Sequence, residues 1–352
     1  MVKVAIIGFG LMGKTHAEAY LSIPHVNIVA IGDAHGNCVN SWPVPHGTKV
    51  YSDVEQVIHE TDADVVDVCL PTHLHEEYVI KAARRGLHIL CEKPLSLTTA
   101  SADRMVTAVR NSGVVFMVGQ VLRFSAHYLK VRELVDGGAI GEPIYAHASR
   151  FSEPPQWAQW FRDPDKSGGA LFDLQIHDLD YAMHLFGRPD SLVTRGVQSE
   201  SGCWDQVCNV LSYPGRQVVI EASYRMPVGW PFTCSLRIVG TAGAIEYGFR
   251  VTGNVDVIAQ AEHSLVLYRN GKPAETFVIE DRSPYLQQLR YFIECVLKKK
   301  RPELVPAEQS RNVIAVLEAS RQSLESGQPV ALTHIPAGVF CRPEQTRRSD
   351  GH

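Results

Sequence analysis

A carboxylate and an imidazole stand one helical turn apart in the run from Gly169 to about Phe186. Asp173 and His177 are at positions i and i+4, so an uninterrupted helix places both on one face. A carboxylate beside an imidazole fixes its tautomer and raises its basicity, which suits a general base for an alcohol proton. A solvated or helix-capping polar face explains the spacing equally well. We expect no metal there, because no further ligand spacing supports one.

Lys93 is the second residue whose position suggests chemistry. It follows the apolar run Leu87 to Cys91, and Pro94 stiffens the backbone after it. A lysine held at the rim of a nicotinamide crevice can stabilise a developing alkoxide, and partial burial would make it a proton carrier. Position alone leaves open the alternative, a surface lysine paired with Glu92.

The amino-terminal stretch reads as strand, glycine turn, helix and strand, and it ends on an acid. Gly8 allows a tight turn, Gly10 lets the backbone approach a pyrophosphate, and Gly13 allows close packing of helix on strand. The start of the helix offers free N–H groups to the phosphates. A plain structural turn is the alternative, but the context on both sides favours a dinucleotide site. The predicted contacts are Gly8, Phe9, Gly10, Leu11, Met12, Gly13 and Asp33.

Asp33 also bears on the choice of cofactor. It lies twenty residues after Gly13, where a carboxylate can accept hydrogen bonds from the ribose hydroxyls. The same carboxylate repels a 2′-phosphate, and Ala34 and His35 supply no arginine. We therefore expect NAD, and NADP only if a neighbouring loop provides a cation.

Buried strands alternate with helices through residues 1–122, which predicts a dinucleotide-binding Rossmann domain with a doubly wound parallel sheet. Ligands of such sheets bind beyond the carboxyl ends of the strands. The segments predicted to line that crevice are Gly8–Gly13, Asp33, Pro71-Thr72, Glu92-Lys93 and Gly119-Gln120.

Strand-like segments accumulate in residues 123–333, which predicts a second, substrate-binding α/β domain with a large, mostly antiparallel open sheet. Pro214-Gly215 and Asn270-Gly271 indicate hairpin turns. A broad sheet needs its other face covered, so we expect a homodimer or homotetramer packed sheet to sheet. The expected helices are 123–138, 169–186, 283–299 and 307–326, and a tail, 334–352, should be an arm or disordered.

Five side chains that precede or flank the helix from Gly169 are hypotheses for substrate contacts. Tryptophan faces stack on sugar C–H surfaces, and arginine can hold hydroxyls or phosphate. The residues are Arg123, Arg150, Trp157, Trp160 and Arg162.

The composition restricts the class of protein. With 352 residues, 45% apolar and 20% charged, the chain has enough apolar residues for two cores. The formal charge of −4 argues against nucleic acid or an anionic membrane as the main partner. No apolar run is long enough to span a membrane, and the first strand begins at Val2, where a signal peptide would stand. Eight scattered cysteines without a CxxC pair fit a reducing cytoplasm.

Taken together, these motifs resemble those of the glucose–fructose oxidoreductase / inositol dehydrogenase / rhizopine-catabolism (Gfo/Idh/MocA) family. The resemblance covers about residues 2–332 and rests on the glycine turn, Cys91-Glu92-Lys93-Pro94, the Gly-Gly-Ala-Leu-x-Asp-x-x-x-His run at 168–177 and the late helix pair. It implies hydride transfer between NAD(P) and a secondary hydroxyl of a sugar, cyclitol or nucleotide sugar.

The resemblance also assigns roles to residues. The family's catalytic lysine, aspartate and histidine fall on Lys93, Asp173 and His177, with Lys93 and Glu92 beside the cofactor. Its adenosine-side residues look like Pro71-Thr72 and His75. The family often has glycine where this chain has Gln175, and we expect this larger side chain to reshape the substrate floor.

Three functions remain open on the sequence. The first is a sugar or cyclitol (inositol-like) dehydrogenase, with a nucleotide-sugar dehydrogenase or keto-sugar reductase as its variant. The second is a glycosidase that keeps NAD bound and uses transient oxidation. The third is a non-catalytic NAD-sensing protein, which would have no need of Lys93, Asp173 and His177 together.

Overall fold

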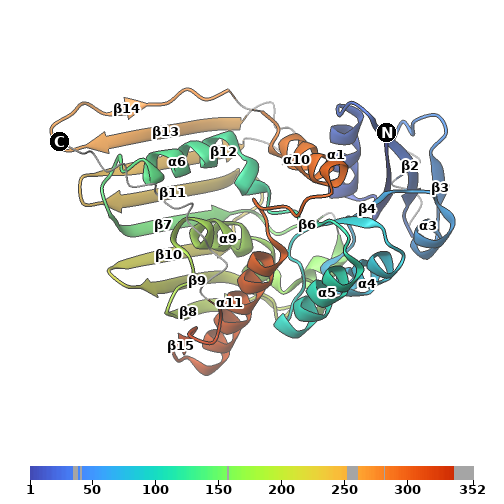
Figure 1. The fold of residues 1–352 in the computed structure, drawn as a ribbon. Helices are drawn as coiled ribbons and strands as arrows, with labels where there is room; N and C mark the ends of the chain where they lie inside the picture. The colour runs from blue at the N-terminus through green and yellow to red at the C-terminus, as the bar shows by residue number, and fades with distance from the viewer. Residues whose placement is uncertain (35–38, 40–41, 157, 252–260, 281, 337–352) are drawn as a thin grey trace.

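The computed structural model describes residues 1–34, 39, 42–156, 158–251, 261–280 and 282–336. Within them the chain forms a six-stranded sheet and a nine-stranded sheet, which lie side by side with helices around them (Figure 1). The predicted α/β class, with one parallel and one mostly antiparallel sheet, is confirmed.

The first sheet has the strand order β3-β2-β1-β4-β5-β6, and every neighbouring pair is parallel. Its apolar strands are buried because helices cover both faces. The strands are β1 (Val2–Ile7), β2 (Val26–Gly32), β3 (Lys49–Tyr51), β4 (Val65–Val68), β5 (His88–Cys91) and β6 (Phe116–Val118). The helices are α1 (Leu11–Leu21), α3 (Val54–Glu60), η1 (Thr72–Leu74), α4 (His75–Arg84) and α5 (Thr99–Ser112).

The second sheet has the order β14-β13-β12-β11-β7-β10-β9-β8-β15 and is antiparallel except where β7 meets β10. The predicted turn at Pro214-Gly215 joins β9 to β10, and the turn at Asn270-Gly271 leads from β13 towards β14. The strands are β7 (Pro143–Phe151), β8 (Ser191–Gln198), β9 (Trp204–Tyr213), β10 (Arg216–Ser223), β11 (Phe232–Gly240), β12 (Gly243–Val251), β13 (Ala261–Arg269), β14 (Glu275–Thr276) and β15 (Val330–Ala331).

Two helix predictions were wrong in their extent. The helix expected from Arg123 begins only at Ala126, because a 3₁₀ turn precedes it, and the helix expected from Gly169 to Phe186 is broken at Leu174. The helical segments are η2 (Val121–Phe124), α6 (Ala126–Asp136), η3 (Gln159–Arg162), α7 (Pro164–Ser167), α8 (Gly169–Asp173), α9 (Gln175–Phe186), α10 (Pro284–Lys298) and α11 (Ala307–Ser326).

The late helices join the two sheets. α10 lies against α1, and its Leu289 and Phe292 are buried in the same core as Val4 and Ile6 of β1 (Figure 1). α11 packs on β8 and on α5. Part of the predicted tail is ordered, since Ile335 is fully buried, whereas residues 337–352 lie outside the described part of the chain.

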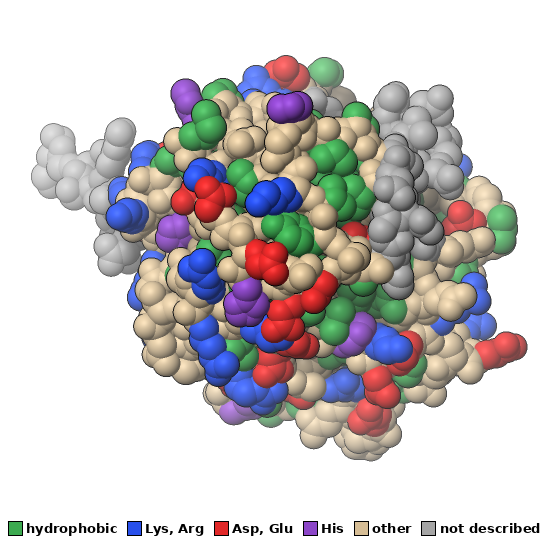
Figure 2. Space-filling model, turned by 90° about the vertical axis from the view of Figure 1, so that its right-hand side faces the viewer, with side chains coloured by type: hydrophobic (Ala, Val, Ile, Leu, Met, Phe, Trp, Pro, Cys, Tyr) green, Lys and Arg blue, Asp and Glu red, His purple; other side chains and the backbone are tan. Residues whose placement is uncertain are grey.

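The surface shows no single dominant charge on the side viewed in Figure 2, where Lys and Arg side chains are interspersed with Asp and Glu. Among the described residues, no helix combines the length and the apolar composition needed to cross a lipid bilayer.

Candidate active site

Lys93 and Asp173 meet across the two domains. Lys93 lies just beyond the carboxyl end of β5, and Asp173 is the last residue of α8. The Lys93 Nζ atom donates to Asp173 Oδ1 at 2.7 Å and to the Asp173 carbonyl oxygen at 2.9 Å. Both side chains are about 15% exposed, so the pair lies at the edge of the interior rather than in it. The surface-lysine reading, in which Lys93 pairs with Glu92, is therefore wrong.

Tyr224 joins Lys93 and Asp173 in a group that we call the Lys93 cluster, and the sequence did not indicate this tyrosine. It directly follows β10, and its hydroxyl donates to the second carboxylate oxygen of Asp173. Burial, followed by the nearby charge of Asp173, raises the pKa of the Tyr224 phenol, which keeps it a hydrogen-bond donor. The tyrosine comes fifty-one residues after Asp173, so no local spacing pointed to it.

His177 does not pair with Asp173, which corrects the expectation from the i and i+4 spacing. The helix breaks at Leu174, and both carboxylate oxygens of Asp173 are taken by Lys93 and Tyr224. Burial, followed by the charges of Lys93 and Arg150, lowers the pKa of His177 well below 6.5. The imidazole is therefore neutral near Lys93, and its Nδ1 atom is buried without a hydrogen-bond partner.

The glycine turn fits a dinucleotide. A Cβ on Gly13 would lie 2.1 Å from the Gly8 carbonyl oxygen, and Gly8 itself has φ +85° and lies against the backbone of Cys69. Gly10, by contrast, faces open space, and no side chain caps the start of α1. The turn thus leaves both the room and the N–H groups that a pyrophosphate requires.

Asp33 lies at the carboxyl end of β2, 8% exposed, and its Oδ2 atom accepts a hydrogen bond from the Phe9 backbone N–H at 2.8 Å. This bond holds the carboxylate beside the glycine turn, where the ribose is expected. The Phe9 side chain is fully buried, so only its backbone can reach a cofactor, while Leu11 is partly exposed at the start of α1 and Met12 follows it.

The residues after β4 and β5 occupy the same end of the parallel sheet. Pro71 precedes η1 and Thr72 begins it, with Thr72 buried. The His75 ring faces two backbone carbonyl oxygens, those of Pro94 at 2.9 Å and Leu70 at 2.7 Å. The ring is 1% exposed and can donate to one of these two oxygens, so His75 holds the loop beyond Lys93, which corrects the expectation of a direct cofactor contact.

The two buried arginines are structural, which corrects their assignment as substrate contacts. Arg123 makes a bidentate ion pair with Asp180 at 2.6 and 2.9 Å, and both side chains are 1% exposed. Arg150 makes a bidentate pair with Asp178 at 2.9 and 3.1 Å. Neither guanidinium can leave its partner for a substrate without stranding a buried carboxylate.

The remaining predicted substrate residues lie near η3. Trp160 is half-buried and stacks on Phe161, with ring centroids 4.0 Å apart, and Arg162 is exposed. Trp157 lies outside the described residues. Gln175 is fully buried, where it donates to the Ile220 carbonyl oxygen and accepts from Asn209. It therefore anchors α9 to the sheet, and the expectation that it reshapes a substrate floor was wrong.

One described cluster has side chains of the types that bind metals. Ligand atoms of His16, Asp67 and Cys69 all lie within 4.8 Å of one another. These groups are already linked by hydrogen bonds: His16 Nδ1 lies 2.8 Å from Asp67 Oδ2, and the Cys69 thiol donates to Asp67 Oδ1 at 3.4 Å.

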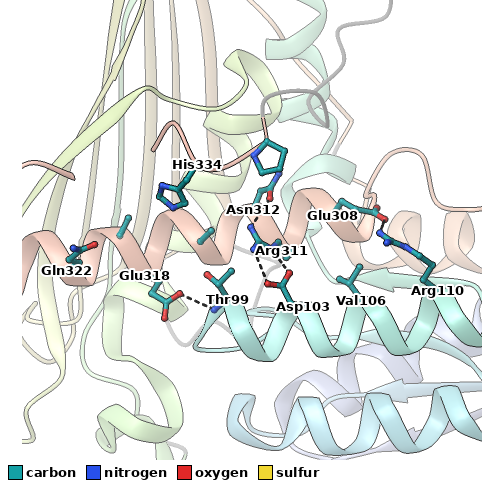
Figure 3. Close-up of a pocket in the computed structure, with 13 residues that line it drawn as sticks. Thr99, Asp103, Val106, Arg110, Glu308, Arg311, Asn312, Glu318, Gln322 and His334 are labelled. Atoms are coloured by element: carbon teal, nitrogen blue, oxygen red, sulfur yellow. Dashed lines mark hydrogen bonds and ion pairs between the residues drawn. The ribbon is translucent and has the colours of Figure 1, made fainter. Parts of the chain in front are cut away.

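A pocket of about 600 Å³ lies away from Lys93. It lies between α5 and α11 and is crossed by ion pairs between the two helices, such as Arg311 with Asp103 (Figure 3). The ionic partners are already matched there, and no group of the Lys93 cluster lines it. The carboxyl ends of the parallel strands, where Lys93 meets Asp173, remain the better site for chemistry.

Comparison with known proteins agrees with this geometry. Residues 2–120 match the Gfo/Idh/MocA oxidoreductase family, NAD-binding Rossmann fold, and residues 128–246 match the family's C-terminal domain. The chain is 33% identical over 360 residues to the D-glucoside 3-dehydrogenase of Escherichia coli, a match that covers 94% of this chain and 97% of that one. It is 29% identical to the myo-inositol 2-dehydrogenase of Thermotoga maritima, over 95% and 99% of the two chains.

A solved structure shares the whole fold. Levoglucosan dehydrogenase, in complex with NADH and levoglucosan, superposes with a TM-score of 0.81 at 20% identity and covers 94% of this chain and 99% of its own. The glycine turn that fits a pyrophosphate and the two matched domains lead to one conclusion: this chain belongs to the Gfo/Idh/MocA family of NAD-binding oxidoreductases.

Proposed function

We propose that the protein oxidises a secondary hydroxyl of a sugar or cyclitol with NAD. The observation that carries the proposal is the contact of Lys93, from the Rossmann domain, with Asp173, from the second domain, beside a neutral histidine. A protein that only sensed NAD would have no use for this convergence. The inositol and glucoside dehydrogenases among the relatives support the substrate class.

Each residue has a distinct role in this proposal. Lys93 has three N–H donors, of which Asp173 takes two, so the third is free for a substrate oxygen. His177, being neutral, accepts the hydroxyl proton, while Lys93 stabilises the alkoxide. Bound NAD would supply the hydride acceptor, so that the alcohol would become a ketone and His177 would keep the hydroxyl proton. Asp173 fixes the position of Lys93 and, with it, the orientation of the alkoxide.

A nucleotide sugar is a weaker candidate for the substrate. That reading depended on arginines that would bind a diphosphate, and Arg123 and Arg150 are both committed to buried carboxylates. Arg162 alone of the three is exposed. An uncharged polyol places no such demand on the site.

A substrate screen tests the proposal. The purified protein is incubated with inositols, aldoses, alkyl glucosides and UDP-sugars, with NAD and NADP in parallel, and NADH or NADPH formation is followed by absorbance. We expect steady NADH formation with at least one uncharged polyol and none with Lys93→Met. Release of an aglycone without net NADH would replace the proposal with a glycosidase, and no turnover of any kind would leave only nucleotide binding.

Two further parts of the proposal concern the assembly and the compartment. The open face of the second sheet suits pairing with a second copy, because half-exposed Tyr145 and Val219 lie on the side away from the helices. The described cysteines are all free thiols, which fits a reducing compartment such as the cytoplasm.

A further inference from the structure

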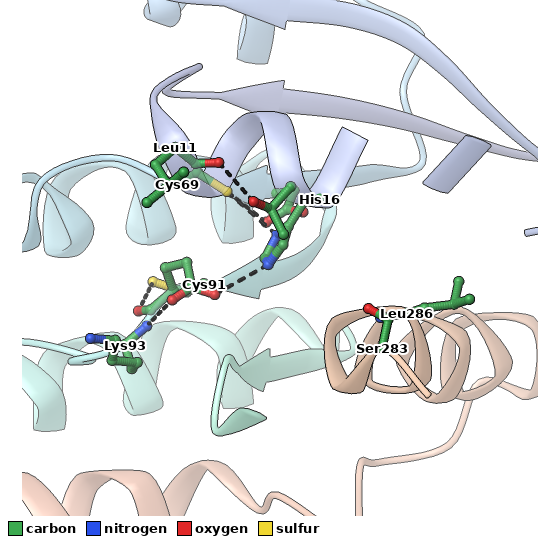
Figure 4. Close-up of polar contacts among 10 residues, drawn as sticks. Leu11, His16, Cys69, Cys91, Lys93, Ser283 and Leu286 are labelled. Carbon is green, nitrogen blue, oxygen red and sulfur yellow. Dashed lines mark hydrogen bonds and ion pairs between the residues drawn. The ribbon is translucent and has the colours of Figure 1, made fainter. Parts of the chain in front are cut away.

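A chain of buried polar groups runs from α1 to the backbone of Lys93 (Figure 4). Its centre is His16, which lies three residues after Gly13 and is fully buried. Asp67 of β4 and Glu92 at the end of β5 are on either side of the imidazole, at 0% and 5% exposure. The proposed mechanism uses none of these three side chains, although burying them together requires a compensating arrangement.

The Nδ1 side of His16 is hydrogen-bonded. Nδ1 lies 2.8 Å from Asp67 Oδ2, and the Cys69 thiol donates to Asp67 Oδ1 at 3.4 Å. Burial lowers the pKa of His16, but the adjacent Asp67 carboxylate opposes this effect, and the net direction is upward from 6.5. With the Asp67 carboxylate at Nδ1 and the Glu92 carboxylate 3.3 Å from Nε2, the surroundings of the ring favour the imidazolium, which carries a proton on each nitrogen.

The Nε2 side of His16 faces the residue that holds Lys93. Nε2 lies 3.3 Å from Glu92 Oε1, within ion-pair range but without hydrogen-bond geometry. The other oxygen of Glu92 accepts the Lys93 backbone N–H at 3.1 Å. Behind the carboxylate lies Gly119, where a Cβ would come within 2.6 Å of Glu92 Oε1. The Glu92 carboxylate thus sits in a slot formed by His16, the Lys93 backbone and a glycine.

We propose that His16 is a positioning residue for Lys93, acting through Glu92. The imidazolium holds the Glu92 carboxylate in its slot, and Glu92 holds the backbone from which the lysine projects. Because His16 belongs to α1, this chain connects the helix whose first turn faces the cofactor to the lysine that meets the substrate. The proposal rests on the proposed dehydrogenase function and adds a residue to it.

Two isosteric substitutions separate the two sides of the ring. In His16→Asn the amide nitrogen takes the place of Nδ1, which keeps the contact with Asp67 and loses Glu92. In His16→Gln it takes the place of Nε2, which keeps Glu92 and loses Asp67. If His16 only stabilised the fold, the asparagine variant would lose less activity than the glutamine variant, because the Asp67 contact is the shorter and the better aligned. The positioning role reverses that order.

We expect kcat of His16→Asn to fall by about ten- to hundredfold, since small displacements of reacting groups are costly. The KM for NAD should change by less than about twofold, because the glycine turn is untouched. His16→Gln should recover at least about tenfold of the lost kcat. Equal losses in both variants, or a better asparagine variant, would overturn the proposal.

Gly119→Ala tests the same route without touching His16. Its methyl group would displace the Glu92 carboxylate, and Gly119 has no positive φ that would add strain. We expect it to reproduce the kcat loss of His16→Asn, and the double variant should lose no more than either single one. His88→Asn is the matched control, because His88 begins the same strand β5 at the end away from Glu92 and its ring accepts a hydrogen bond from the Val115 N–H.

Thermal melting and NADH titration establish that each variant is folded and binds cofactor. If the wild-type protein turns over no substrate, the proposed function is refuted. The positioning role is then tested separately, by the chemical reactivity of the Lys93 amine. Its rate of modification by trinitrobenzenesulfonate, followed by peptide mass spectrometry, should rise in His16→Asn and stay near the wild-type rate in His16→Gln. An unchanged rate in the asparagine variant would refute the positioning role.

Discussion

His177 differs from a free histidine in one property that can be measured directly. Burial, Lys93 and Arg150 lower the pKa of its imidazole well below 6.5, so it keeps its acceptor lone pair in mildly acidic solution. At saturating NAD, kcat/KM for the polyol reports the enzyme–NAD complex that the polyol binds, and its acidic limb should lie well below pH 6.5. The pH dependence of kcat/KM, measured with saturating NAD, checks this. A midpoint at 6.5 or higher would mean that His177 is not the proton acceptor.

Removing the Tyr224 hydroxyl takes away one of the two side-chain partners of the Asp173 carboxylate. Its hydroxyl donates to one carboxylate oxygen while Lys93 takes the other. Hydrogen bonds to charged groups contribute about 1.5–3 kcal/mol, so Tyr224→Phe should lower kcat/KM by about tenfold or more. Steady-state kinetics measures the loss, with the KM for NAD unchanged.

The control for this change is Tyr213→Phe. Tyr213 is also a tyrosine of the second sheet, and its hydroxyl donates to the Gly187 carbonyl oxygen at 3.2 Å, outside the Lys93 cluster. It should retain wild-type turnover. If Tyr224→Phe did the same, Asp173 would not need the phenol to hold Lys93.

At the scale of the elements, α9 is fixed to the sheet by a buried charge pair. Arg150 of β7 and Asp178 of α9 have side chains 6% and 1% exposed. Breaking such a pair from one side leaves an uncompensated charge, so Arg150→Met should lower the free energy of unfolding by about 3–5 kcal/mol. Urea denaturation measures it, and Arg150→Met/Asp178→Leu should recover part of the loss.

An exposed ion pair between α5 and α11 is the comparison. Arg311 contacts Asp103 at 2.7 and 2.9 Å, but the Asp103 side chain is 54% exposed. Pairs in contact with water contribute about 0–1 kcal/mol, so Asp103→Asn should change stability little. A large loss of unfolding free energy in Asp103→Asn, or a small loss in Arg150→Met, would contradict the claim that burial makes an ion pair costly to break.

The sequence predicted those elements that depend on local pattern. Alternating strands and helices fixed the Rossmann domain, and Pro214-Gly215 fixed a hairpin, because each requires only neighbouring residues. The helix break at Leu174 was missed because the apolar period continues across it. The partners of Asp173 were also missed, since Tyr224 and Lys93 reach it only through the tertiary fold.

Residue type alone also misplaced the arginines. Arg123 and Arg150 were predicted to meet substrate because they flank the catalytic helix in the sequence. Their carboxylate partners, Asp180 and Asp178, come from that same helix and turn them inward. The sequence shows that an arginine lies close to the catalytic helix along the chain. Whether its side chain points to the substrate or into the core depends on long-range packing.

At the scale of the whole molecule, the nine-stranded sheet has two unlike faces. Val218 and Ile220 of β10 point into the core under the helices, while Val219 between them points to the opposite side and is only half-buried. Tyr145, on β7 next to it, is 36% exposed. Cross-strand polar pairs, such as Ser149 with Ser235, satisfy one another within this face.

A face of this kind suits a symmetric interface, because a two-fold axis brings the same patch of both copies together. We therefore expect the protein to be a dimer or tetramer in solution, and Tyr145→Glu/Val219→Glu should dissociate it, since four carboxylates would then face one another. Light scattering coupled to size exclusion measures the mass. Leu21→Glu, a charge placed on the exposed end of α1, is the control and should leave the assembly intact. A wild-type monomer, or an assembly that survives both glutamates, would show that this face is not where copies meet.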